Sequence, residues 1–72
     1  MENYLNNSGN SPITHYKIGN DYVIVRFNGG KDYSYSYLGK AGKSNVETMK
    51  ILAVNGSGLS AYITKNVRFL YD

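Results

Sequence analysis

Tyr33, Tyr35 and Tyr37 lie two residues apart in the run YSYSY. Because alternate side chains of a strand point to the same face, this spacing aligns three phenol rings on one side of a sheet. Such rings stack on bases when positive charge lies nearby, and they also fill the core of a small domain that has few other large residues. The face that the rings occupy therefore decides between a binding role and a packing role.

Three cations accompany these tyrosines in the sequence. Arg26 lies near the end of the preceding apolar segment, and Lys40 and Lys43 belong to GKAGKS, residues 39–44, which precedes an expected helix. Backbone amides at a helix N-terminus, with lysines beside them, hold a phosphate without hydrolysing it. The leading glycine of a P-loop is missing because position 37 is tyrosine. We predict a ligand site made of the three tyrosines and these three cations; a loop with solvated lysines is the alternative.

The elements that would position these residues begin with strands. Residues 1–12, rich in Asn, Ser and Gly, predict a flexible N-terminal arm, and residues 13–72 predict a single domain. Residues 13–18, 22–27 and 33–38 have the β-branched and aromatic content of strands, and glycine-containing turns separate them. We expect these three strands to form an antiparallel meander.

Helical spacing follows the strands. Val46, Met49, Leu52 and Ala53 recur as on one face of a helix, for which Ser44 or Asn45 is the expected cap. The sequence NGSG, residues 55–58, ends this helix, and a second begins at Leu59. Strands first and helices second indicate an α+β fold, a three-stranded antiparallel meander followed by two helices packed on one face.

The length of the hairpin loop after Phe27 determines where the tyrosines point. A loop of three or five residues places Tyr33 and Tyr35 on the face of Val23, Val25 and Phe27, where they join the core. A loop of two or four residues places them with Tyr22, Ile24 and Arg26 instead, as an exposed aromatic platform. Both arrangements are compatible with the sequence.

Composition excludes several classes of function. The chain has no cysteine and a single histidine, His15, and its five carboxylates form no recognisable acid–base pair. We therefore expect no catalysis, no metal site and no cofactor. The chain contains no long apolar run of the kind that forms a signal peptide or a membrane span. We therefore expect a cytoplasmic location. The net charge of +3 favours anionic partners, and the small core leaves self-association into a homo-oligomer open.

Several segments resemble the KTSC domain family in their order and spacing. They are VRFNGG (25–30), YSY (33–35), GSGLSAYI (56–63) and VR (67–68) with Tyr71, and the resemblance spans about residues 13–71. The family is named for its occurrence at the C-terminus of some lysyl-tRNA synthetases, and it also occurs as small standalone bacterial and viral proteins. The resemblance implies RNA binding, and a viral origin is compatible with it.

Two functional hypotheses follow. The first is a non-catalytic module that binds single-stranded RNA or a small nucleotide, in the second case as a sponge that sequesters the nucleotide. The second is a small protein-interaction or inhibitor module, in which an exposed face or the second helix, with Leu59, Tyr62 and Ile63, docks on a protein partner.

Overall fold

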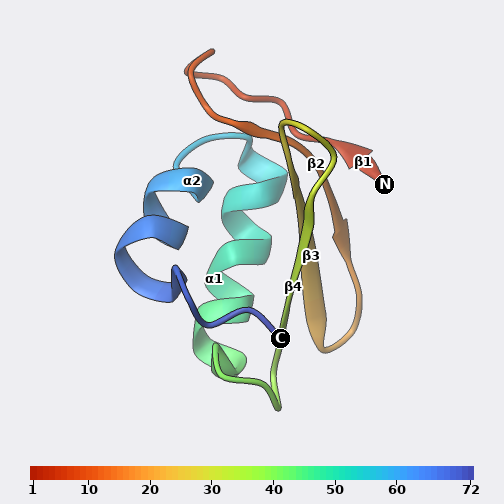
Figure 1. The fold of residues 1–72 in the computed structure, drawn as a ribbon, viewed down its shortest axis with the longest axis vertical. Helices are drawn as coiled ribbons and strands as arrows, with labels where there is room; N and C mark the ends of the chain where they lie inside the picture. The colour runs from red at the N-terminus through yellow and green to blue at the C-terminus, as the bar shows by residue number, and fades with distance from the viewer.

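One antiparallel sheet and a helical layer on one of its faces make up the computed structural model, which describes residues 1–72 (Figure 1). The expected α+β class is confirmed, but the sheet has four strands rather than three. The strands lie side by side in chain order: β1 (Glu2–Asn3), β2 (Ile13–Ile18), β3 (Tyr22–Phe27) and β4 (Asp32–Ser36). The helical layer contains α1 (Gly42–Asn55), α2 (Leu59–Tyr62) and a π-helical turn, η1 (Ile63–Val67).

The extra strand comes from the segment expected to be a flexible arm. Glu2 and Asn3 pair with β2, and the Tyr4 side chain is buried in the core at 6% exposure. The N–H of Asn7 donates to the carbonyl of Gly56 at 2.8 Å, which fastens the segment to the end of α1. The composition of this segment did not indicate that it would pack against the rest of the fold. One buried aromatic ring and a few backbone hydrogen bonds are enough to dock it.

The hairpin between β3 and β4 settles the orientation of the tyrosines. The N–H of Phe27 donates to the carbonyl of Lys31 at 2.9 Å, so residues 28–30 form a three-residue loop, and Gly29 and Gly30 adopt positive φ angles of 91° and 84°. In this register Val25 lies opposite Tyr33. Of the two arrangements that the sequence allowed, the structure has the one in which Tyr33 and Tyr35 share the core face of Val23 and Val25.

Helix α1 begins earlier than its expected start near Val46. Its first residue is Gly42, and the Asn45 side chain does not cap it. Asn45 Nδ2 instead donates to the carbonyl of Ala41 at 2.9 Å, and Asn45 Oδ1 accepts a hydrogen bond from the Tyr62 hydroxyl at 2.6 Å. This amide therefore joins the start of α1 to α2 rather than ending the helix.

The NGSG segment is a tight connection between α1 and α2, as expected from the sequence. Gly56 ends α1 with a φ of 77°, and its N–H donates to the carbonyl of Leu52 at 3.0 Å. A Cβ at this position would lie 2.5 Å from the Cβ of Leu5, so the docked N-terminal segment also requires glycine here. The backbone of Gly56 therefore lies in close contact with Leu5 of the N-terminal segment.

The second helical segment turns its apolar residues inward. Leu59 and Val67 are fully buried, Ile63 is 6% exposed, and Tyr62 is partly buried against α1. The expectation that Leu59, Tyr62 and Ile63 form an exposed docking face is therefore wrong. None of the helices has both the length and the apolar character that crossing a membrane requires.

Candidate functional site

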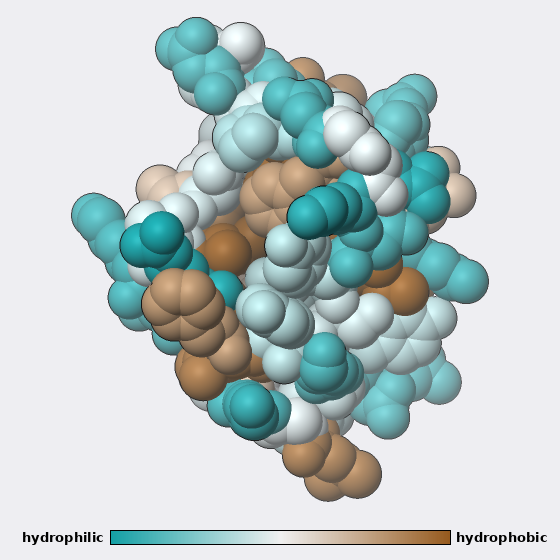
Figure 2. Space-filling view, in the orientation of Figure 1, coloured by the Kyte–Doolittle hydropathy of each residue, from teal (hydrophilic) through white to brown (hydrophobic).

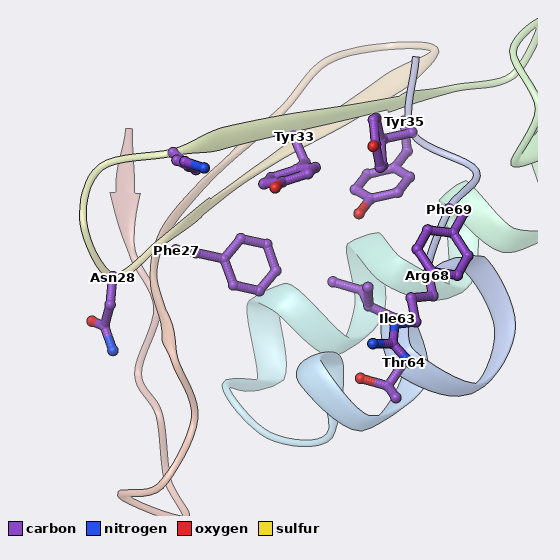
Figure 3. Close-up of a pocket in the computed structure, with 10 residues that line it drawn as sticks. Phe27, Asn28, Tyr33, Tyr35, Ile63, Thr64, Arg68 and Phe69 are labelled. Carbon is purple, nitrogen blue, oxygen red and sulfur yellow. The ribbon is translucent and has the colours of Figure 1, made fainter.

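A pocket of about 390 Å³ lies between the inner face of the β3–β4 hairpin and the end of the helical layer (Figure 3). Strand residues line one side of it, and η1 with the following C-terminal residues lines the other. Ten residues form its wall: Phe27, Asn28, Lys31, Tyr33, Tyr35, Ile63, Thr64, Arg68, Phe69 and Tyr71.

Aromatic rings dominate the wall. Five of the ten aromatic residues in the chain lie here, including both phenylalanines. Tyr33 makes edge-to-face contacts with Phe27 and Tyr71, at ring-centroid distances of 5.5 and 4.8 Å. Phe69 is 72% exposed at the rim, and Figure 2 shows hydrophobic surface over this end of the helical layer. An exposed phenylalanine beside a pocket offers apolar area to a ligand rather than to the core.

The hydroxyl of Tyr35 has no hydrogen-bond partner in the protein. The tyrosine hydroxyls that do have one belong to Tyr4, Tyr37 and Tyr62. The Tyr35 side chain is only 1% exposed, but every side-chain nitrogen or oxygen that is fully enclosed has a hydrogen-bond partner. Because the Tyr35 hydroxyl has none, its oxygen must reach the open space of the pocket. In Figure 3, Tyr35 lies across the pocket from Ile63. Burial raises the pKa of Tyr35 to about 12, so the phenol stays protonated at neutral pH.

Two unpaired cations complete the wall. The ion pairs of the protein join Arg26 to Asp32 and Lys50 to Glu47, and neither Lys31 nor Arg68 takes part in one. No carboxylate lines the pocket. The pocket therefore combines flat apolar surface with uncompensated positive charge.

The local backbone explains how the helical side of the pocket is built. Ile63 and Val67 are buried at the two ends of η1, which fixes the turn against the core. Thr64 and Arg68, one position further along, consequently face the pocket, and the Arg68 guanidinium lies 5.2 Å from the centre of the Phe69 ring. A π-helical turn at this place is typical of sites where the helix is adapted to a function.

The structure divides the six residues that the sequence assigned to one site. Tyr33 and Tyr35 line the pocket, but Arg26 lies on the opposite face of the sheet. Arg26 Nε donates to Asp32 Oδ1 at 2.7 Å, and the partner guanidinium holds the pKa of Asp32 below its usual range. Because the three-residue loop puts Arg26 and the core tyrosines on different faces, they do not form one surface.

Tyr37, Lys40 and Lys43 lie elsewhere: Tyr37 and Lys40 belong to the loop between β4 and α1, and Lys43 lies in the first turn of α1. The Tyr37 hydroxyl donates to the Glu47 carboxylate, and this contact raises the pKa of Tyr37. The ammonium groups of Lys43 and Lys50 lie 5.5 and 5.1 Å from the centre of the Tyr37 ring. The hydroxyl and the ring of Tyr37 are thus engaged by protein groups, which leaves little of this side chain for stacking with a base.

Five charged or aromatic residues that line the pocket were not in the sequence-based assignment, although the sequence contained signals for three of them. Phe27 follows from the hairpin register, and Arg68 and Tyr71 belong to the segments resembling the KTSC family. Lys31 and Phe69 carry no local pattern that marks a site. They meet only because the chain turns back after η1, where the N–H of Asp72 donates to the carbonyl of Ser34 at 2.7 Å.

A second hollow, of about 410 Å³, lies under the N-terminal segment. Its wall consists mostly of small polar residues and contains no charged side chain, and the hydroxyl of Tyr4 there accepts a hydrogen bond from the N–H of Leu59 at 3.4 Å. The aromatic pocket is therefore the stronger candidate, because it alone of the two offers unpaired charge together with stacking surface.

Comparison of the chain with models of protein families, with curated proteins and with solved structures finds no match.

Proposed function

We propose that this protein binds a small nucleotide in the aromatic pocket and holds it without altering it chemically. The observation that carries the proposal is the composition of the wall, five aromatic rings and two unpaired cations with no carboxylate. Aromatic side chains stack on every kind of base, and arginine and lysine bind phosphate through charge-assisted hydrogen bonds. Phe69 and Tyr33 would contact the base, and Arg68 with Lys31 would neutralise the phosphate.

The dimensions of the site favour a small ligand over an RNA strand. A volume of about 390 Å³ falls within the range of about 300–1,000 Å³ typical of small-molecule pockets. A strand needs cations in a row along its backbone. The hairpin that carries Lys31 and the loop that carries Lys40 lie at opposite ends of the molecule in Figure 1, so they do not extend one continuous groove.

A binding protein of this size would act by sequestration, as a sponge that lowers the free concentration of its ligand. Membership of the KTSC family remains part of this proposal, and its association with nucleic-acid enzymes agrees with a nucleotide ligand. The pocket groups are phenols, a guanidinium, an ammonium, a hydroxyl and an amide, which are groups suited to holding an anion at neutral pH.

Isothermal titration calorimetry with AMP, GMP, CMP and UMP tests this function directly. We expect saturable one-site binding of at least one of them by the wild-type protein. The variant Arg68→Ala should bind it about tenfold or more weakly, because a hydrogen bond to a charged group is lost. Lys65→Ala is the matched control, since Lys65 belongs to the same turn but does not line the pocket, and it should bind within about twofold of wild type.

Two results would contradict the proposal. One is an absence of saturable binding by all four nucleotides. The other comes from fluorescence polarisation with a labelled single-stranded RNA at low and moderate salt. Tight binding of this RNA that falls steeply with salt, without competition by the mononucleotides, would identify an RNA-binding surface in place of the small-ligand pocket.

A further inference from the structure

The unpartnered hydroxyl of Tyr35 is out of keeping with the rest of this interior. The side chain is among the largest that are fully buried, and no other fully buried side chain carries a polar group. The hydroxyl itself reaches the open space of the pocket and makes no hydrogen bond to the protein, so the oxygen contributes no contact that would hold the ring in the core. The pocket that the oxygen faces is the one place from which a partner can come.

The position of this hydroxyl is rigidly defined. Tyr35 lies in β4, directly opposite Val23, and its ring is packed into the core. Phe69 and Arg68, by contrast, are exposed at the rim of the pocket and free to adjust to a ligand. A donor on a strand of a packed sheet selects among ligands more sharply than one on a mobile segment, because it cannot follow a misplaced acceptor.

We propose that Tyr35 determines which base the pocket accepts, by donating a hydrogen bond from its hydroxyl to a ring nitrogen or carbonyl oxygen at the inserted edge of the base. This inference rests on the proposed function, since it assumes that a nucleotide enters the pocket with its phosphate toward Arg68 and Lys31. The phenol remains a donor because burial keeps it protonated well above neutral pH. A base that presents only a C–H group at this position makes no hydrogen bond to the hydroxyl, and it would bind more weakly.

The variant Tyr35→Phe removes the hydroxyl alone and keeps the packed ring. We expect it to bind the preferred member of the AMP, GMP, CMP and UMP panel about tenfold more weakly and to bind the four with nearly equal affinity. Its melting temperature should stay the same or rise, because the missing oxygen had no protein partner. Loss of affinity without loss of stability is a combination that a merely structural role does not produce.

Tyr62→Phe provides the matched control. The Tyr62 hydroxyl donates to Asn45 Oδ1 at 2.6 Å, and Tyr62 does not line the pocket. Its removal should lower the melting temperature and leave nucleotide affinity within about twofold of wild type. The two phenylalanine variants are therefore expected to give opposite results for nucleotide affinity and for melting temperature.

The outcomes separate this inference from the proposed function. If wild type binds a nucleotide and Tyr35→Phe retains both its affinity and its base preference, the role of Tyr35 is wrong while the pocket stands. A clear fall in the melting temperature of Tyr35→Phe would also overturn the inference, since it would show that the hydroxyl has a structural partner. If wild type binds none of the four nucleotides, both proposals fail.

Discussion

Two regions of this small protein combine tyrosine with positive charge, and they differ in what the fold has left unpaired. In the aromatic pocket, the hydroxyl of Tyr35 has no hydrogen-bond partner in the protein, and Lys31 and Arg68 have no carboxylate partner. In the end cluster, which we define as Tyr37, Lys43, Glu47 and Lys50, the phenol donates to a carboxylate that also pairs with Lys50 at 3.0 Å. Similar residue types are left without ion pairs in one region and join β4 to α1 in the other.

This difference shows what distinguishes a candidate site from a structural contact. Folding normally satisfies polar groups with one another, as it does in the end cluster. Polar groups that have no hydrogen-bond or ion-pair partner in the protein and lie beside a cavity are free to bind a ligand that enters it. The predictions below perturb the two regions in parallel, beginning with the largest expected effect.

Removal of the ring at position 35 should have the greatest consequence. Tyr35→Ala leaves a cavity beside Val23 in the core, and by analogy with other buried aromatic truncations it should lower the free energy of unfolding by about 3–5 kcal/mol. Tyr37→Ala removes a partly exposed ring and should lower the free energy of unfolding by clearly less. Urea denaturation followed by circular dichroism measures both. Equal losses for the two variants would show that the regions are not packed differently.

Charge reversal should have the second-largest effect, and its effect on nucleotide binding should differ between the two regions. Arg68→Glu places a carboxylate in the pocket and should weaken nucleotide binding by about 10- to 100-fold, in line with the loss of a hydrogen bond to a charged group. Lys43→Glu introduces the same charge in the end cluster and should have a much smaller, salt-sensitive effect. Calorimetric titration of both variants at two salt concentrations checks this. The opposite ranking would move the binding site to the loop before α1.

Alkaline pH provides a test that needs no ligand. Because the pKa of Tyr35 is raised to about 12 in the folded protein, this side chain stays protonated while an unfolded tyrosine loses its proton near its ordinary pKa of about 10. The unfolded state then binds fewer protons, so stability is fully present below about pH 10 and declines as the pH rises toward 12. Thermal melts at pH values between about 9 and about 11.5 should show a melting temperature that declines less steeply with pH for Tyr35→Phe than for wild type.

The same measurement has a clear opposing result. If wild type and Tyr35→Phe lose stability in parallel as the pH rises, the phenol at position 35 is not buried in the folded state as described. Tyr62→Phe serves again as the control, because the decline that is due to Tyr35 should persist in it.

The smallest effect is expected where the sequence placed the phosphate site. Replacement of both Lys40 and Lys43 by alanine should leave nucleotide affinity within about twofold of wild type, since neither residue lines the pocket and only general electrostatic attraction is lost. Calorimetry with the nucleotide that wild type prefers measures this effect. A tenfold loss, on the order of one charged hydrogen bond, would restore the loop as the phosphate-binding element.

The sequence was sufficient for the class of fold and reduced the location of Tyr33 and Tyr35 to two alternatives. The turn chemistry at Asn28–Gly30 limited the hairpin to a few loop lengths, and each of them fixed the face of every residue in β4. The N-terminal strand was not predictable in this way, because it depends on Tyr4 reaching a core that forms from distant segments. Local propensity carries no information about such a contact.

The composition of the pocket was also beyond local reasoning. Lys31 and Arg68 are far apart in the sequence and meet only through the packing of η1 against the sheet. The predicted partners Arg26, Lys40 and Lys43 are close to the tyrosines in sequence, but the alternation of a strand and the length of the sheet separate them in space. Proximity along the chain was therefore a poor guide to which cation shares a site with which ring.

The most direct test of the central claim is a titration of ¹⁵N-labelled protein with the four nucleoside monophosphates, followed by two-dimensional NMR. The account predicts saturable shifts of the backbone amides of Lys31, Tyr35, Arg68 and Phe69 and of their neighbours in the aromatic pocket, while the amide of Lys43 in the end cluster remains in place. Shifts confined to the end cluster, or none at all, would contradict it.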